Sequence, residues 1–231
     1  MLFRSSQEPS AQTTAMTVAA GTPATSAAAS APATSSPAAT SASAVTVPAT
    51  PALSLAEAHD ATTAAAKGAA TGAALSVSDN PQRADATRVT PLATVASSAL
   101  DERAKGFDLH DAGNLFDDDF STAWVEGASG NGPGEYLVFD FDGPTTLTRL
   151  CIAAGFDKSE KLYGQNARPE QVTIIADGEV VGTATLADEY GTWQVVDLGG
   201  SVTASSVALR IDSVYAGSYY SDCAISELFW A

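Results

Sequence analysis

Aromatic residues are almost confined to the second part of this 231-residue chain, because none occurs between Phe3 and Phe107. A segment without aromatic and with few large aliphatic side chains cannot bury enough apolar surface to offset the entropy lost on ordering. We therefore expect residues 1–85 to form a disordered low-complexity stalk or linker and residues 86–231 to form one folded domain. A segment of that length is large enough to enclose its own hydrophobic core.

The expected stalk is rich in Ser, Thr, Pro and Ala, as in residues 26–44, SAAASAPATSSPAATSASA. Scattered prolines favour extended conformations, and small polar residues keep such a tract soluble. Residues 53–74 have helix propensity from their alanine content but lack a stripe of large apolar side chains. A helix there is expected to be marginal, with His59 in solvent.

The chain carries a formal net charge of −16, and most of this charge lies in residues 86–231. Nucleic-acid binding calls for a basic face, so this acidic balance excludes a nucleic-acid partner. It also argues against electrostatic docking on anionic lipids. No run of 18 or more apolar residues predicts a transmembrane segment, and the first residues lack the apolar core of a signal peptide. A stalk before an acidic β-domain nevertheless suggests an extracellular or cell-surface location.

The sequence after residue 86 consists of short apolar runs bounded by Gly, Asp, Asn and Pro, which is typical of strands. Runs such as YLVFDF and VALRIDSV alternate, so one face would pack on a core. Asp177-Gly178 is a signal for a two-residue type I′ hairpin. The expected strands are 90–97, 135–141, 146–154, 171–176, 179–186, 193–198, 206–214 and 224–230. They predict an all-β, antiparallel jelly-roll β-sandwich of about eight strands.

Two cysteines, Cys151 and Cys223, lie in apolar runs of the expected domain. An even pair in an exported domain is compatible with a disulfide, whereas buried thiols are equally ordinary in strands. The sequence leaves these alternatives open. Two thiols without a nearby histidine do not make a metal site.

An acidic turn and a distant glutamate form the most informative pair of motifs. Residues 114–127 read NLFDDDFSTAWVEG, and residues 224–230 read AISELFW with Glu227 inside an apolar strand. A carboxylate in that position is costly unless a cation or hydrogen bonds satisfy it. The acidic turn offers the second half of a cation site. This pairing favours a β-sandwich in which a bound cation joins the turn to the last strand, and it argues against an enzyme active site.

Together with residues 132–141, 150–156 and 163–174, these motifs resemble a discoidin-like jelly roll, the coagulation factor type C or galactose-binding-like domain. The most similar subgroup is the translocation domain of bacterial NAD glycohydrolase toxins, which is shared with many bacterial surface proteins. The resemblance covers residues 88–231, and nothing in the chain corresponds to an NAD glycohydrolase catalytic domain. The turn of the family typically reads Asp-Gly-Asp, so Asp118 replaces a glycine. Asp tolerates a left-handed backbone better than most residues.

The resemblance implies one structural Ca²⁺ between the acidic turn and the last strand, held by Asp117, Asp119, Thr122 and Glu227. Hard oxygen ligands at a turn suit this ion. The alternative is that the aspartates simply cap the turn while Glu227 hydrogen-bonds to backbone amides.

Two further residues are expected to have structural roles. Trp124 follows the acidic turn between Ala123 and Val125 and is expected in the core. Arg168 has the planar fork that holds a carboxylate or loop carbonyls.

Ligand binding is expected in loops at one end of the sandwich. Sugar rings stack on aromatic platforms while polar side chains bind their hydroxyls, so the ligand-binding candidates are Tyr163, Tyr215, Tyr219 and Tyr220. The same tyrosines could instead order a long loop.

Catalysis has little support in the sequence. His110 is the single histidine of residues 86–231, and no Ser or Cys lies in a nucleophile motif. We therefore expect a non-catalytic, monomeric module on a flexible stalk that binds a cell-surface or cell-wall glycan. The alternative is a protein-interaction or structural translocation accessory domain that contacts a surface protein and no sugar.

Overall fold

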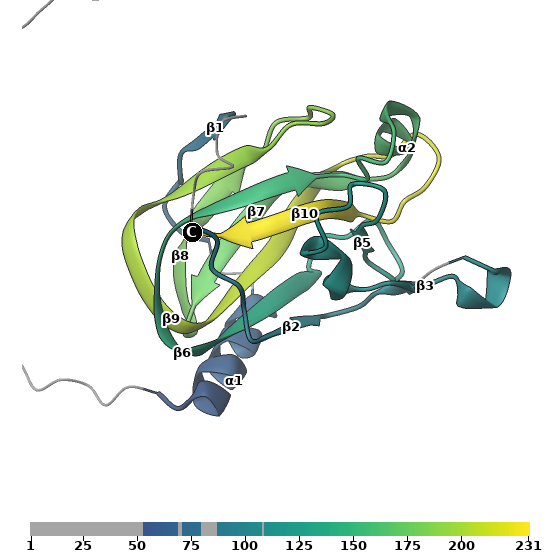
Figure 1. Cartoon of the computed structure of the whole chain (residues 1–231). Helices are drawn as coiled ribbons and strands as arrows, with labels where there is room; N and C mark the ends of the chain where they lie inside the picture. Colours follow the sequence, from purple (N-terminus) through teal and green to yellow (C-terminus); the bar gives the residue numbers. More distant parts are fainter. Residues whose placement is uncertain (1–52, 69–70, 80–86, 108) are drawn as a thin grey trace, which may run out of the picture. The chain divides into compact units, whose positions relative to one another are not determined.

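A computed structural model describes residues 53–68, 71–79, 87–107 and 109–231. Two long antiparallel strands, β6 (Tyr136–Ala154) and β9 (Gln194–Tyr215), run side by side through it (Figure 1). Their register shifts between Asp140 and Thr145 and again between Leu147 and Arg149. At these irregularities both strands bend from one layer of a sandwich into the other.

The remaining strands pair with the two halves of β6 and β9. The first layer contains β2 (Ala93–Ala96), β7 (Arg168–Ala176) and β8 (Glu179–Thr185). The second layer contains β1 (Val77–Asp79), β5 (Trp124–Val125) and β10 (Ala224–Trp230). A separate two-stranded ladder joins β3 (Leu100–Asp101) to β4 (Leu109–His110). All strand pairs are antiparallel, so the predicted β-sandwich is confirmed.

One helix precedes the first strand, and three short helical segments lie between later strands of the described residues. They are α1 (Leu55–Ala66), η2 (Arg103–Lys105), η3 (Ala112–Leu115) and α2 (Glu160–Gln165). A capping box begins α1, because the Ser54 side chain accepts from the Glu57 amide while Glu57 accepts from the Ser54 amide. Among the described residues, no helix is long and apolar enough to cross a membrane.

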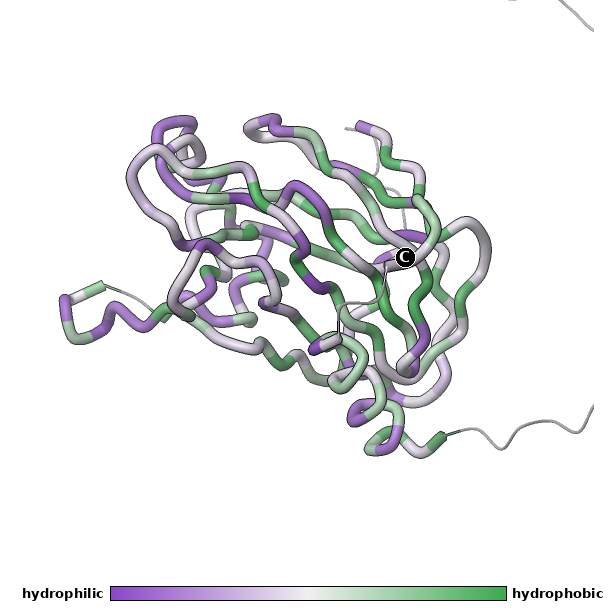
Figure 2. Tube along the Cα trace, turned by 180° about the vertical axis from the view of Figure 1, so that it is seen from behind, coloured by the Kyte–Doolittle hydropathy of each residue, from purple (hydrophilic) through white to green (hydrophobic). Residues whose placement is uncertain are grey.

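The hydrophobic core lies between the two layers. Strands carry most of the hydrophobic residues, whereas the projecting segment around η2 is largely hydrophilic (Figure 2). Trp124, Phe139 and Trp230 are fully buried, and the Phe139 and Trp230 rings meet edge to face at 5.5 Å. The Trp124 indole N–H donates to the Ser98 carbonyl oxygen at 3.0 Å. The core position predicted for Trp124 is confirmed.

Several predicted strands coincide with observed ones, but two pairs of them are merged. Residues 135–141 and 146–154 both belong to β6, and residues 193–198 and 206–214 both belong to β9. Gly and Asp interrupted the apolar pattern at the bends, although the backbone pairing continues through them. The predicted hairpin joins β7 to β8, with φ of 46° at Asp177 and 90° at Gly178. Positive φ at both residues is what a type I′ turn requires.

Part of the segment expected to be disordered is folded onto the sandwich. Helix α1 and strand β1 both lie within residues 1–85, and α1 contacts β6 and β9. Small side chains let this helix approach the sheet closely, so a stripe of large apolar residues was not needed. His59 is not fully in solvent, because its Nδ1 lies 2.8 Å from the Asp140 carboxylate. Residues 1–52, including the tract 26–44, lie outside the described residues, and the boundary at residue 85 stays a prediction.

The two cysteines are not joined in a disulfide. Cys151 belongs to a cluster with Val195 and Phe229, whereas Cys223 belongs to the main core between the layers. Because they lie in different clusters, the buried-thiol alternative holds in this structure.

Truncation of Phe139 tests the central core. Phe139→Ala removes a ring that packs between Phe116 and Trp230. We expect a loss of about 3–5 kcal/mol in the free energy of unfolding, measured by urea denaturation. Tyr219→Ala is the control, because its side chain is 74% exposed, and it should leave the stability almost unchanged. Equal effects of the two substitutions would contradict this core assignment.

Candidate functional site

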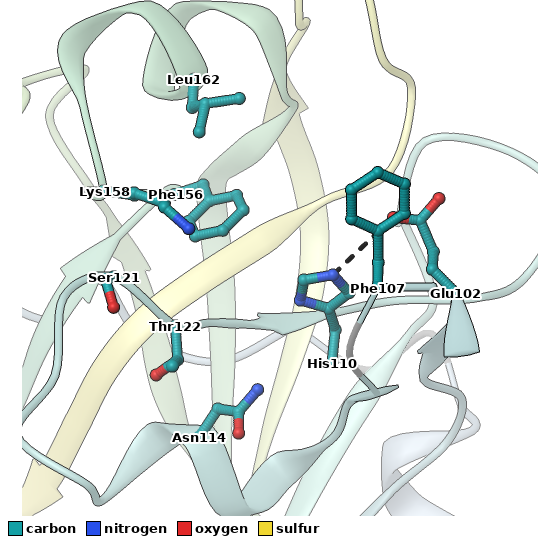
Figure 3. Close-up of a pocket in the computed structure, with 9 residues that line it drawn as sticks. All are labelled: Glu102, Phe107, His110, Asn114, Ser121, Thr122, Phe156, Lys158 and Leu162. Atoms are coloured by element: carbon teal, nitrogen blue, oxygen red, sulfur yellow. Dashed lines mark ion pairs between the residues drawn. The ribbon is translucent and has the colours of Figure 1, made fainter. Parts of the chain in front are cut away.

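A groove opens at the end of the sandwich where the β3–β4 ladder, η3 and α2 meet (Figure 3). Two adjoining cavities of about 240 and 210 Å³ form it. They share five lining residues, namely Glu102, Phe107, His110, Phe156 and Leu162. The shared walls make the two cavities one continuous site, which we call the end groove.

The middle of the end groove is apolar and aromatic. Phe107 lies on the segment between η2 and β4 and is 64% exposed. Phe156 follows β6, and the His110 ring meets it edge to face with centroids 5.9 Å apart. Leu162 of α2 completes this surface (Figure 3). Exposed aromatic carbon of this kind can stack on the C–H face of a ligand ring.

Polar side chains border the aromatic surface. His110 Nε2 lies 3.9 Å from Glu102 Oε2, while Lys105 donates to Glu102 Oε1 at 2.9 Å. His110 Nδ1 is buried and has no hydrogen-bond partner in the structure. The side-chain Nδ2 of Asn114 donates to the Ala123 carbonyl oxygen at 2.9 Å, and this hydrogen bond fixes the wall of the groove.

The two ends of the groove differ in charge. Asp222 lines one end with Tyr220, and burial together with Glu102 raises the pKa of the Asp222 carboxyl. Lys158 lines the other end with Ser121 and Thr122. A bound ligand would therefore meet carboxylates at one end and an ammonium group at the other.

Two of the predicted ligand tyrosines, the buried Tyr163 and the half-buried Tyr215, have hydroxyl groups that hydrogen-bond within the domain. Tyr163 is buried, and its hydroxyl donates to Asp188 at 3.0 Å. Burial and this hydrogen bond raise the pKa of the Tyr163 hydroxyl. The Tyr215 hydroxyl donates to the Leu186 carbonyl oxygen at 3.0 Å. Neither ring lines the end groove, so both tyrosines help to order the loops instead.

Arg168 connects these tyrosines. Its guanidinium lies over the Tyr163 and Tyr215 rings, 4.9 and 5.8 Å from their centroids. It also forms a bidentate pair with Asp188, with Nε–Oδ1 and Nη2–Oδ2 distances of 2.6 and 2.5 Å. Its Nη1 donates to the carbonyl oxygens of Asn166 and Ala216. The predicted role of Arg168 in holding a carboxylate and loop carbonyls is confirmed.

The other two tyrosines lie on the exposed loop between β9 and β10. The Tyr219 and Tyr220 rings pack edge to face at 4.7 Å, and Tyr220 lines the acidic end of the groove. Both amides donate to the Gln165 carbonyl oxygen, which anchors the loop on the end of α2. Gly217 allows this approach, because a Cβ there would collide with the same carbonyl. The structure thus brings Tyr220 to the groove and leaves Tyr219 beside it.

The acidic turn lies next to the Lys158 end of the end groove, because Thr122 belongs to the turn and also lines the groove. The Thr122 hydroxyl donates to Asp117 Oδ2 at 2.8 Å and is 2.9 Å from the Asp119 carbonyl oxygen. Asp117 Oδ1 in turn accepts from the Asp119 amide at 2.9 Å. Asp118 has a φ of 57°, so the position where the family typically has glycine does adopt a left-handed backbone. Its carboxylate pairs with Arg88 at 2.5 Å.

Glu227 lies beside this turn and is 1% exposed. Its Oε1 is buried without a hydrogen-bond partner. Burial, followed by the neighbouring Asp117 carboxyl, raises the pKa of Glu227 to about 8. A buried oxygen ligand without a partner, with a second carboxylate at hand, fits a hard cation. Over the described residues no three His, Cys, Asp or Glu side chains converge, so a cation would also need Thr122 and backbone carbonyls.

Sequence reasoning missed most of the end groove. Phe107, Phe156 and Leu162 come from three separate segments, and only the fold brings them together. His110 is the single histidine of residues 86–231, and nothing in the sequence around it indicates a ligand site. The usable signal was Phe107, an aromatic residue in a charged, glycine-containing segment (DERAKGF) that offers it no core.

Glu227 predicts a dependence of stability on pH. Without a cation, folded Glu227 keeps its proton up to about pH 8, whereas the unfolded side chain releases it near its ordinary pKa of 4.5. The stabilisation is complete below pH 4.5 and is lost as the pH rises toward 8, so the free energy of unfolding should fall across this window. Glu227→Gln should reduce the slope, measured by chelator-treated urea denaturation.

The upper part of that window is the most informative, because burial also raises the pKa of Asp157, to about 6. Glu189→Gln removes an exposed carboxylate and serves as the control. An identical slope above pH 6 in the wild type, Glu227→Gln and Glu189→Gln would refute the assignment to Glu227.

Comparisons with known proteins agree with this architecture. Residues 87–231 match the family model described as NAD glycohydrolase translocation F5/8 type C domain. No curated protein matches the chain.

Solved structures with the same fold include the CBM32-1 and CBM32-2 domains of Clostridium perfringens ZmpB in complex with GalNAc. That structure has a TM-score of 0.51 and 13% identity, covering 71% of this chain and 40% of that one. The structure of the same two domains with the M60 catalytic domain has a TM-score of 0.52 and 14% identity. It covers 71% of this chain, which spans only 17% of that protein.

The family match extends over most of the chain and begins just before β2. The discoidin-like resemblance expected from the sequence is therefore confirmed. Through residues 87–231, this chain belongs to the NAD glycohydrolase translocation F5/8 type C domain family.

Proposed function

We propose that the domain is a carbohydrate-binding module whose ligand site is the end groove. The observation that carries this proposal is the aromatic surface formed by the exposed Phe107 and the half-buried Phe156, bordered by His110 and Glu102. Sugars need this combination, because their C–H faces stack on aromatic rings while polar side chains bind their hydroxyls. The Glu102 carboxylate, which lines both cavities of the end groove, is a hydrogen-bond acceptor for such hydroxyls.

The fold supports the same proposal. The ZmpB structure contains CBM32 domains with GalNAc bound, so this architecture can present a sugar site. The end groove lies at the end of the sandwich, and its two phenylalanines, Phe107 and Phe156, come from segments outside the strands, where residues can vary without loss of the core. We propose a cell-surface or cell-wall glycan as the ligand and an extracellular location for the domain.

The alternative function is that of a protein-interaction or translocation accessory domain. The name of the matched family, which refers to translocation, is the observation that favours it. Such a role requires a protein partner and no sugar. A screen of the full-length chain against immobilised glycans separates the two functions.

Phe107 is the residue whose removal tests the glycan site. Phe107→Ala should weaken binding to a glycan found in the screen by at least about tenfold, which corresponds to 1.4 kcal/mol. Leu92→Ala is the matched control, because Leu92 on the segment before β2 is similarly exposed at 66% and is not among the residues that line the groove. Affinity is measured by titration calorimetry, and melting temperatures should stay close to wild type. Equal affinities of the two variants would move the ligand site away from the end groove.

We also propose a structural Ca²⁺ beside the groove. Asp117, Asp119, Thr122 and Glu227 would hold it, together with backbone carbonyls, and the ion would supply positive charge that neutralises the buried Glu227 and the exposed aspartates of the turn. The ion would tie the acidic turn to β10 and so support the groove wall that contains Thr122.

Calcium should raise the melting temperature of a chelator-stripped sample, because it binds only the folded chain. The gain in melting temperature should be larger at pH 8.5 than at pH 6. With a pKa of about 8, Glu227 is protonated at pH 6, so calcium must displace that proton before it can bind. Glu227→Gln should abolish most of the gain, whereas Glu189→Gln should keep it. A wild-type melting curve that calcium does not shift would leave the aspartates as turn caps only.

A further inference from the structure

Residues 53–68 and 71–79 precede the segment that matches the family, yet they pack on it along most of their length. Helix α1 covers the outer face of the first layer (Figure 1). Its buried residues are Ala58, Thr62 and Ala66. Beneath it lies a small apolar cluster in which Val138, Ile175 and Ala208 are fully buried.

Polar contacts fix α1 at both ends. His59 Nδ1 lies 2.8 Å from Asp140 near the first turn, and the Thr62 hydroxyl lies 3.4 Å from the Ser206 carbonyl oxygen. After the helix, Arg210 donates a hydrogen bond to the Gly68 carbonyl oxygen. These contacts join α1 to β6 and β9, so the helix has a defined position on the sheet.

The chain after α1 continues along the edge of the first layer. The Leu75 amide donates to the Thr183 carbonyl oxygen at 2.6 Å, and the Thr183 amide donates to Ala73 at 2.8 Å. β1 then pairs with β9 through Val77 and Val196. Without residues 73–75, β8 would be the unpaired edge of this layer among the described residues.

Glycines make this close approach possible. A Cβ on Gly72 would lie 2.7 Å from the Gly182 Cα, and a Cβ on Gly182 would lie 2.6 Å from the Leu75 Cγ. Real side chains cannot occupy such positions without displacing backbone. The segment and β8 are therefore shaped to each other, which a chance contact would not require.

The surface under this segment is suited to self-association. β8 reads EVVGTAT, with several β-branched residues, one charge and no proline. Exposed edge strands with this composition pair readily with another chain. A second copy offers the same edge, and antiparallel pairing of two identical edges closes as a two-fold dimer. The apolar cluster of Val138, Ile175 and Ala208 lies on the adjoining face and would add to such an interface.

We propose that residues 53–68 and 71–79 form a strap, which completes the folded domain and shields a self-association surface along β8. Release of the strap lets a second copy of the chain pair with the exposed edge. The proposal concerns a face built from β6, β7, β8 and β9 and does not depend on glycan binding at the end groove.

A charge under α1 tests the strap in the full-length chain. Ala58→Glu places a carboxylate on the buried face of the helix, whereas Ala64→Glu places the same group on its exposed face. Both replace Ala with a good helix former, so the comparison isolates the cost of burying charge. For Ala58→Glu we expect at least about tenfold faster hydrogen exchange at the Thr183 amide and a concentration-dependent dimer in light scattering. Ala64→Glu should remain monomeric with wild-type exchange.

A second pair of variants acts at the strand contact, in case Ala58→Glu fails to fold. Gly72→Val forces the strap away from the β8 backbone, and Thr71→Val is its exposed neighbour and control. Gly72→Val should reproduce faster Thr183 exchange and dimer formation. Wild-type exchange at Thr183 in both test variants would refute the strap. Faster exchange in a chain that stays monomeric at every concentration would refute the shielding role.

Discussion

The pairing of β6 with β9 is the interaction on which the rest of the structure depends. The two strands contribute residues to both layers, so a single hydrogen-bonded ladder connects the two faces of the core. Every other strand of the sandwich pairs either with β6 or β9 or with a strand that itself pairs with one of them. Because the ladder bends at its register shifts, large side chains such as Phe139 and Leu150 from one strand meet inside the same core.

The end groove is a consequence of how this core closes. Its aromatic surface comes from segments that leave the strands, and buried polar contacts hold those segments in place. Arg168 is central here, because one guanidinium holds Asp188, two loop carbonyls and two tyrosine rings. A single charged group thus anchors the loop that carries Tyr220 without itself lining the end groove. Such anchoring pre-organises the end groove and would lower the entropy lost if a ligand binds there.

The sequence alone predicted the features that depend on local patterns. Apolar runs bounded by turn residues located β10 and β7, Asp177-Gly178 located a hairpin, and the guanidinium fork of Arg168 indicated a carboxylate partner. The acidic turn and Glu227 were also paired correctly in space, since a buried carboxylate demands a partner. The end groove could not be predicted in this way. Tyr163 and Phe107 look alike as loop aromatics, but only the tertiary packing buries the first and exposes the second.

Tertiary packing also explains why the strap was not predicted, because the sequence predicted disorder for a segment that the structure shows packed on the sheet. A segment rich in Ala and Gly lacks the large apolar side chains that it would need to fold in isolation. The sheet, however, supplies most of the apolar partner surface, through residues such as Val138 and Ile175. Small residues then become an advantage, because each methyl group reaches a face that a larger side chain would hold at a distance. Low complexity is therefore a poor guide to disorder where an adjacent domain presents an uncovered face and an unpaired strand edge.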